Sequence, residues 1–237
     1  MRAVLLPICL VAAVTAAAGE SSGPVLYQGF EDGHFFANLT KNGYTSAPNG
    51  PGGVWAAFND PESLTRTREQ AAVGDWSVKV IRGNPPKSSL LGVARQAVKP
   101  PFEVELWMLR GPKGAASVIP FCLDSENPDK PFQPVRFLCS QNGRLLLYDA
   151  ESDRYLPTDV SAPEGSWMQL KFRFTGQTCA VTIAIEGEEK ALGVVPSLQL
   201  ASRGIERLKV APAVSPSGSA VYIDEISFTA LTLTEEK

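Results

Sequence analysis

The chain has 237 residues, and its 22 Lys and Arg against 25 Asp and Glu give a formal net charge of -3. This near-neutral balance, with no block of basic residues, excludes the electrostatic footprint of a protein that binds nucleic acid or an anionic membrane. A single histidine, His34, excludes His-rich zinc sites and paired-histidine metalloprotease motifs.

The N-terminus has the pattern of a secretory signal at residues 1–18. Arg2 precedes an apolar run from Ala3 to about Val14, and small residues follow it up to Ala18. The run is shorter than the ~20 apolar residues that cross a bilayer, which argues against the alternative of a membrane anchor. We therefore expect cleavage after Ala18, a secreted or periplasmic protein, and no membrane insertion after cleavage.

Short apolar or alternating runs follow one another through the rest of the chain, separated by clusters of Gly, Pro, Asn and Asp. This pattern is typical of an all-β sandwich. We expect one domain over 19–233, with a long surface loop at 33–60 and a disordered tail at 234–237. Asn142-Gly143 between two apolar runs predicts a hairpin with a type I′ turn. The expected strands are Val25–Phe30, Trp76–Ile81, Leu90–Ala94, Phe102–Leu109, Ala115–Cys122, Val135–Cys139, Arg144–Tyr148, Trp167–Phe174, Cys179–Ile185, Ile205–Val210 and Ala220–Phe228.

Signal cleavage would leave three cysteines, Cys122, Cys139 and Cys179. In an oxidising compartment this odd count allows at most one internal disulfide. We expect Cys122 and Cys139 to pair, because they flank one loop between two expected strands, and closing that loop would contribute about 3 kcal/mol. The alternative is that all three are buried free thiols. Their spacing does not suit a zinc site.

The strand expected at 102–109 carries the main candidate site. Alternation puts Glu103, Glu105 and Trp107 on one face and apolar side chains on the other. The two carboxylates would lie about 7 Å apart at Cβ, which makes Glu103 and Glu105 candidate acids of a retaining glycosidase. Two alternatives stay open. One is an ordinary solvated sheet face, and the other is a binding site in which Trp107 stacks on a sugar ring and the glutamates accept from hydroxyls.

Aromatic residues in the expected long loop form a second candidate. Trp55 and Tyr44 lie where a ligand platform would form, although they would equally close the end of a sandwich. We assign Trp76 and Trp167, which begin expected strands, to core packing. His34 is interpreted as a loop residue rather than a catalytic base.

The last expected strand contains a charge among apolar residues. Alternation predicts that Tyr222, Asp224, Ile226 and Phe228 share one face. A carboxylate in such surroundings must be paired, hydrogen-bonded or metal-bound. Backbone N–H donors or an arginine are the simplest partners for Asp224.

Several segments together resemble the concanavalin-A-like and laminin-G-like jelly-roll superfamily, and the resemblance covers most of the chain after the signal. They are Tyr27–Gly33, Gly74–Val80, the hairpin at Asn142–Asp149 that leads to Gly165-Ser166-Trp167, and Tyr222–Phe228. The resemblance implies a two-sheet antiparallel jelly roll associated with carbohydrate.

The resemblance also implies that the first and last strands are neighbours. Glu31 and Asp224 then stand at positions where acidic residues help to bind a structural calcium ion in related sandwiches. The β-glucanases of this group carry Glu-x-Asp-x-Glu on their catalytic strand. This chain departs from that pattern, with Glu105 in the middle place and Trp107 in the third.

Together these features predict a secreted, non-catalytic carbohydrate-binding or surface-interaction module whose partner is a glycan or cell-surface polysaccharide, not a nucleic acid. The first alternative is a polysaccharide-degrading hydrolase or lyase of the same group. The second is a structural envelope or adhesion protein. Calcium is the one cofactor that the resemblance suggests.

Overall fold

The structure is a computed structural model, and its described residues are 21–31, 39–40, 43–44, 53–58, 64–82, 89–121, 133, 135–149, 152–196, 204–213 and 216–231. Within these ranges the chain forms strands and no helix, so no helix there is long and apolar enough to cross a membrane. The expected signal and tail, as well as His34 and Cys122, lie outside the described residues.

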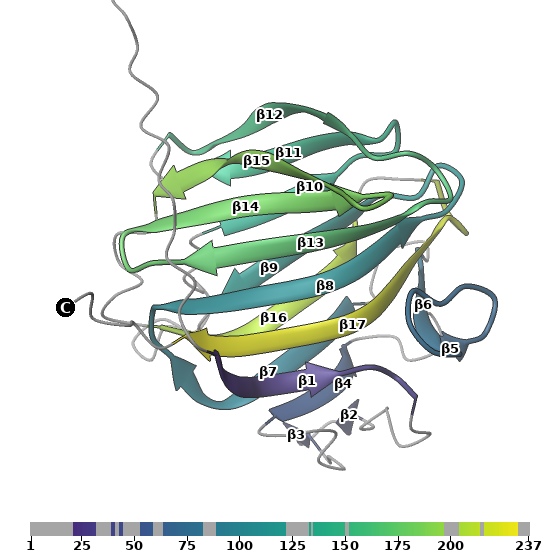
Figure 1. Cartoon of the computed structure of the whole chain (residues 1–237). Helices are drawn as coiled ribbons and strands as arrows, with labels where there is room; N and C mark the ends of the chain where they lie inside the picture. The colour runs from purple at the N-terminus through teal and green to yellow at the C-terminus, as the bar shows by residue number, and fades with distance from the viewer. Residues whose placement is uncertain are drawn as a thin grey trace, which may run out of the picture.

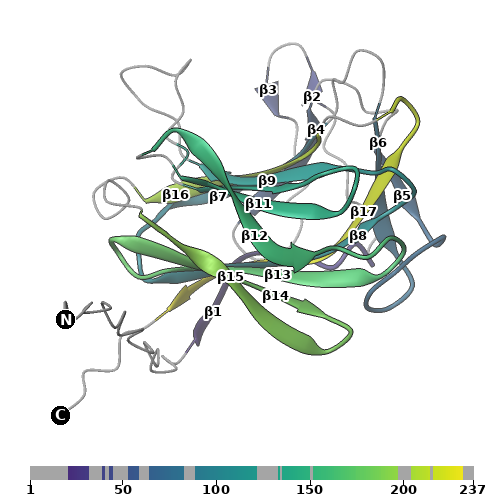
Figure 2. The ribbon, with the colours of Figure 1, turned by 90° about the horizontal axis from the view of Figure 1, so that it is seen from above.

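Two antiparallel sheets are stacked as the layers of a sandwich, seen face-on in Figure 1 and from above in Figure 2. The first sheet has the strand order β15 (Glu188–Pro196), β14 (Thr178–Ile185), β13 (Trp167–Phe174), β8 (Phe102–Arg110), β17 (Ala220–Leu231), β6 (Ser77–Ile81) and β5 (Leu64–Thr67), and β1 (Ser21–Gln28) also pairs with β17. The second sheet has the order β12 (Arg154–Ser161), β11 (Arg144–Asp149), β10 (Val135–Cys139), β9 (Ala116–Phe121), β16 (Ile205–Pro212), β7 (Ser89–Val98) and β4 (Gly53–Phe58). A separate ribbon contains β2 (Leu39–Thr40) and β3 (Gly43–Tyr44).

All the strands expected from the sequence are present, and the first and last strands are neighbours, as the resemblance implied. The loop expected at 33–60 is interrupted by β4, which forms the edge of the second sheet. Three further strands, β5, β12 and β15, were not expected from the sequence. They lie at the edges of the two sheets, and each buries at most one apolar side chain.

The core lies between the sheets and follows from the alternation of each central strand. Every second side chain from Phe102 to Met108 on β8, and from Met168 to Phe174 on β13, is fully buried. The Phe102 ring stacks on Phe174 with centroids 4.5 Å apart and on Phe228 at 5.0 Å. Because the apolar set faces inward, the remaining side chains of the same strands stand on the outer face of the first sheet.

The last strand departs from simple alternation. A register shift lies between Asp224 and Ser227, and Glu225 has a positive φ of 45°. This β-bulge inserts one residue, so the side chains exchange faces on either side of it. Tyr222 and Asp224 pair with outward residues of β8, whereas Ile226 and Phe228 belong to the core. The prediction that these four residues share one face was therefore wrong.

The hairpin between β10 and β11 is present, but its turn is not type I′. The Gly143 N–H donates to the Ser140 carbonyl at 2.9 Å, so Asn142 and Gly143 are the third and fourth residues of the turn. Of these residues only Gly143 has a positive φ, 81°, whereas a type I′ turn needs positive φ at both central residues. A Cβ on Gly143 would lie 2.5 Å from the Ala162 carbonyl, which explains the glycine.

Candidate functional site

The outer face of the first sheet presents side chains from three adjacent strands, β13, β8 and β17, in three parallel ranks. The strand register fixes these ranks as Arg173, Glu103 and Thr229, then Lys171, Glu105 and Ser227, then Gln169, Trp107 and Asp224. We call these nine residues the outer grid. Neighbouring side chains in a rank are about 5 Å apart at Cβ, so the grid brings the three predicted residues of β8 together with hydrogen-bonding partners.

The two glutamates of the grid are tied to the neighbouring strand. The Lys171 ammonium lies 4.0 Å from the Glu103 carboxylate and 3.9 Å from that of Glu105. The Gln169 side-chain amide also donates to Glu105. Burial raises the pKa of Glu103, and the nearby Lys171 charge offsets part of that effect. The side chains of Glu103, Glu105 and Lys171 remain 21%, 27% and 33% exposed, so a ligand on this face can still reach them.

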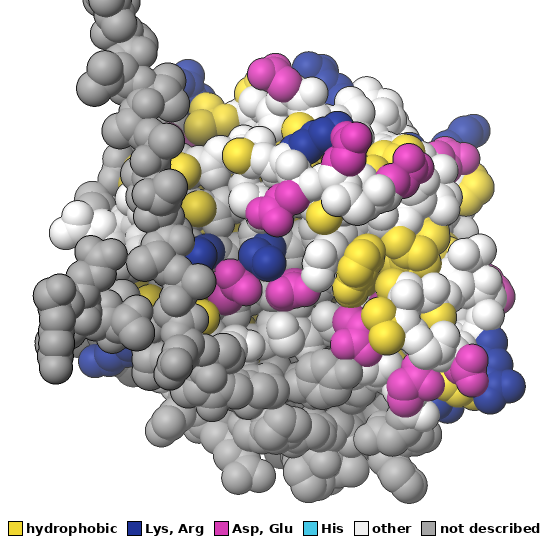
Figure 3. Space-filling view, viewed as in Figure 1, with side chains coloured by type: hydrophobic (Ala, Val, Ile, Leu, Met, Phe, Trp, Pro, Cys, Tyr) yellow, Lys and Arg dark blue, Asp and Glu magenta, His cyan; other side chains and the backbone are white. Residues whose placement is uncertain are grey.

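An aromatic group continues the grid beyond Trp107. The next rank contains Trp167, Leu109 and Tyr222. Trp167 precedes the buried Met168 and is half-buried on the outer face, so its assignment to core packing was wrong. The alternation Trp167, Gln169, Lys171 in the sequence was the signal that could have revealed this. In Figure 3 hydrophobic side chains gather beside the acidic and basic ones on this face.

The loop that joins β5 to β6 covers Asp224 and binds its carboxylate. Oδ2 accepts the backbone N–H groups of Ala72 at 2.8 Å and Val73 at 3.1 Å, and Oδ1 accepts the N–H of Glu225 at 2.8 Å. Asp224 is fully buried, and this burial raises its pKa to about 6 although the three N–H groups favour the charged form. The expectation that backbone donors satisfy Asp224 is confirmed.

Glu31 holds the same loop from its other end. Its Oε1 accepts the N–H groups of Asp75 at 3.1 Å and Trp76 at 3.0 Å. Both oxygens of Asp224 and one oxygen of Glu31 accept N–H groups, so this pair of carboxylates does not fit a calcium ion in this arrangement. Within the described part of the chain, no three His, Cys, Asp or Glu side chains are grouped so that they could hold a metal.

Trp76 anchors the base of this loop, in agreement with its assignment to packing. It packs against the core cluster, and the guanidinium groups of Arg66 and Arg68 lie 3.5 Å and 4.3 Å from its ring centroid. Arg66 also donates to the carbonyls of Phe30 at 2.6 Å and Glu31 at 2.5 Å. The loop beside the outer grid is therefore rigidly attached to β5 and β6.

The structure does not bring the other predicted aromatic residues into this sheet. Trp55 lies on β4, at the edge of the second sheet, where its backbone is opposite Gly92. Tyr44 lies on β3 in the separate ribbon. Only the backbone is described at these two positions, so their predicted role in ligand binding stays a prediction.

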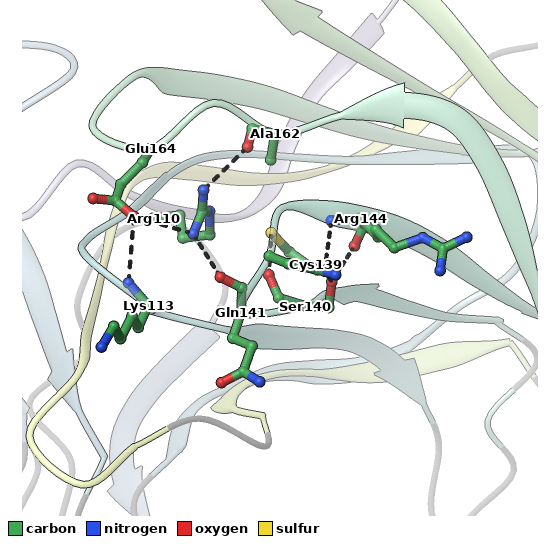
Figure 4. Close-up of polar contacts among 9 residues, drawn as sticks. Arg110, Lys113, Cys139, Ser140, Gln141, Arg144, Ala162 and Glu164 are labelled. Atoms are coloured by element: carbon green, nitrogen blue, oxygen red, sulfur yellow. Dashed lines mark hydrogen bonds and ion pairs between the residues drawn. The ribbon is translucent and has the colours of Figure 1, made fainter.

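A buried arginine closes the corner between the two sheets (Figure 4). Arg110, at the end of β8, donates to the carbonyls of Gln141 at 2.9 Å and Ala162 at 3.3 Å and lies 3.5 Å from the Glu164 carboxylate. These partners come from the β10–β11 turn and from the segment after β12. We interpret Arg110 as a structural residue that ties the second sheet to the first.

Cys139 lies near this corner and is a buried free thiol, as is Cys179. This differs from the predicted disulfide between Cys139 and Cys122 and agrees with the alternative of free thiols at the two described positions. Burial raises the pKa of the Cys139 thiol to about 11, although the Arg110 charge lowers it in part. Neither thiol has the lowered pKa of a reactive cysteine.

Comparison with known proteins identifies the fold. No protein-family model and no curated protein sequence matches the chain. The exoplasmic/lumenal domain of VIP36 in its Ca²⁺-bound form superimposes with a TM-score of 0.50 and 12% identity, over 80% of this chain and 88% of that domain. A Lotus tetragonolobus seed lectin matches with a TM-score of 0.48 and 10% identity, over 76% and 100%. A protein of unknown function from Shewanella oneidensis MR-1 matches with 0.48 and 15%, over 81% and 92%.

The two antiparallel sheets, together with the match to VIP36, show that the chain has the concanavalin-A-like jelly-roll fold expected from the sequence. At this identity the match describes the fold and not the ligand.

Proposed function

We propose that the protein is a secreted, non-catalytic carbohydrate-binding module, and that the outer grid with Trp107 and Trp167 is its binding face. The observation that carries the proposal is the placement of Trp107 beside Gln169 and next to the rank of Glu105 and Lys171. A sugar ring presents an apolar face and a rim of hydroxyls, and this arrangement offers an aromatic face bordered by donors and acceptors.

The polar groups of the grid are held in place before a ligand arrives. Lys171 is positioned between the two glutamates, and Gln169 is bound to Glu105. Such preorganisation reduces the entropy that binding would otherwise lose. The indole of Trp107 supplies the stacking surface, while Glu103 and Glu105 accept hydrogen bonds from hydroxyls and Lys171 donates to them.

We propose a non-catalytic module because both candidate acids form ion pairs with the same lysine, Lys171. A retaining glycosidase needs one ionised nucleophile and one protonated acid. The Lys171 charge works against the second requirement at Glu103, because it opposes the rise in the Glu103 pKa that burial causes. The raised pKa of Glu103 is the one observation that favours hydrolysis as a second candidate function. Loss of polysaccharide turnover in Glu103→Gln, with binding retained, would establish the enzyme instead.

The test begins with a glycan array on the protein from Gly19 onward, followed by titration of the best ligand while tryptophan fluorescence is recorded. We expect the ligand to change the fluorescence, and Trp107→Ala to weaken binding about tenfold or about 1.4 kcal/mol, the size of one aromatic contact. Val194→Ala, which shortens a 66% exposed apolar side chain on β15 at the edge of the same sheet, is the control and should bind normally. Equal weakening in both variants, or no ligand on the array, would refute the proposal and favour a structural envelope or adhesion protein.

Export is part of the proposal and has its own test. N-terminal sequencing of the exported protein should start at Gly19, as the cleavage pattern predicts. Calcium is left out of the binding mechanism, because the carboxylates proposed from the resemblance already accept backbone N–H groups.

A further inference from the structure

The outer face of the second sheet carries a different rank of side chains. Tyr155 on β12 is opposite Tyr148 on β11, and Tyr148 is opposite Arg136 on β10. Continuing the β10–β9 register beyond Phe137 and Val118 places Arg136 beside Ile119, which is opposite Lys209 on β16. We call Arg136, Ile119 and Lys209, together with the two tyrosines, the cationic rank.

The two cations of this rank form no ion pair with any described residue, in contrast to three of the described lysines. Lys171, Lys79 and Lys190 each lie within 4.0 Å of a glutamate, but no ion pair in the described ranges reaches Arg136 or Lys209. Burial lowers the pKa of Lys209, with no neighbouring acid acting against it. The Nε hydrogen of Arg136 is buried and has no acceptor. Half-buried cations without a neighbouring anion destabilise the free protein. A bound anion would offset this cost, so the cationic rank is suited to binding one.

The aromatic end of the rank is fixed in position. The Arg136 guanidinium lies 4.5 Å from the Tyr148 ring centroid, and the Tyr148 hydroxyl donates to Asp153. The Tyr155 ring is tilted against Tyr148 with centroids 5.4 Å apart and is 39% exposed. Asp153 is bound to Tyr148 and forms no ion pair with Arg136, so the rank presents an aromatic ring followed by two positive charges.

We propose that the cationic rank is a second binding site, whose ligand is a saccharide that carries carboxylate or sulfate groups. Arg136 and Lys209 are two strands apart, about 10 Å at Cα, so they donate to anionic groups on separate sugar units while a ring packs on Tyr155. The net charge of the chain is -3, so overall charge does not attract a polyanion and affinity must come from a local site. This site lies on the opposite sheet from the outer grid and does not depend on the function proposed there.

The test compares three polymers with one backbone: dextran, carboxymethyl-dextran and dextran sulfate. Binding to the full exported protein is measured by calorimetry at a fixed ionic strength. We expect one or both charged polymers to bind and dextran not to bind at this site, and the stronger of the two identifies carboxylate or sulfate as the ligand group. Arg136→Gln and Lys209→Met should each weaken binding about tenfold or more, the loss expected for one charge-assisted hydrogen bond. Lys209→Met keeps the length of the half-buried side chain, so it separates charge from packing.

Arg144→Gln is the matched control, because Arg144 is an exposed cation on β11, the strand that carries Tyr148. It should leave binding of the charged polymer within twofold of the parent. Failure of both charged polymers to bind, or equal weakening by Arg144→Gln and Arg136→Gln, would overturn the proposal. The titrations are repeated in Trp107→Ala, which removes the stacking surface of the outer grid, so that binding of the dextran backbone there is not counted as binding to the cationic rank. In this background Arg136→Gln and Lys209→Met should still weaken binding of the charged polymer, whether or not the outer grid binds neutral sugars.

Discussion

The Asp224→Asn substitution should destabilise the protein at acid pH and stabilise it above neutral pH. Burial raises the pKa of Asp224 from 3.8 to about 6, so the folded protein binds more protons than the unfolded chain in this window. The free energy of unfolding must then fall as pH rises from about 4 to about 7. At 1.36 kcal/mol per pKa unit the fall due to Asp224 is about 3 kcal/mol.

The Asn side chain keeps a carbonyl oxygen for Ala72 and Val73 but loses the bond that the Glu225 N–H makes to Oδ1. That loss costs about 1 kcal/mol at every pH. Asp224→Asn should therefore be less stable than the parent at pH 4 by about 1 kcal/mol and more stable at pH 8 by about 2 kcal/mol.

The assay is urea unfolding of both proteins at several pH values from 4 to 8, followed by circular dichroism. Taking the difference between the two proteins removes the contributions of other titrating groups. A difference that is constant with pH, or a parent that becomes more stable than Asp224→Asn as pH rises, would contradict this prediction. It would mean that the three N–H groups outweigh burial in setting the pKa of Asp224.

Three further predictions concern the same loop and the core. Gly74→Ala should lower the free energy of unfolding by about 2 kcal/mol or more, because Gly74 has φ +65° and an added Cβ would lie 2.5 Å from the Glu31 carboxylate. Gly165→Ala is the control, since Gly165 has a similar φ but its added Cβ would meet nothing within 4 Å. Equal losses in both variants would contradict the role of Glu31. Excess calcium or a chelator should leave the thermal midpoint unchanged, since Glu31 and Asp224 already accept N–H groups, and a calcium-dependent rise would restore the metal site. Iodoacetamide at pH 8 should not modify Cys139 or Cys179 in the folded protein, because burial raises both pKa values; peptide mapping by mass spectrometry that finds either one modified before unfolding would show an open core.

The central strands were predictable because their alternation is unbroken. Glu103, Glu105 and Trp107 alternate with fully buried residues on β8, so their position on one outer face follows from a period of two. The same rule applied to β13 would have placed Trp167 with Gln169 and outside the core. That error came from treating the tryptophan as an anchor rather than following the alternation.

Other features depend on contacts that no local pattern records. The bulge at Glu225 inserts one residue into β17, and nothing in the neighbouring sequence marks it, yet it moves Asp224 to the outer side. Two of the three N–H groups that bind Asp224 belong to Ala72 and Val73, more than a hundred positions away in the chain. The cationic rank was missed for the same reason, since Arg136 and Lys209 come together only through the order of β10, β9 and β16.

Sugar binding at the outer grid is tested directly by a crystal structure of the protein with the neutral oligosaccharide that gives the largest tryptophan fluorescence change. We predict a sugar ring stacked on Trp107 on the outer face of the first sheet, with hydroxyls bonded to Glu105 and Lys171. A sugar bound only on the second sheet or on the loops, with the face over β8 and β13 left bare, would contradict it.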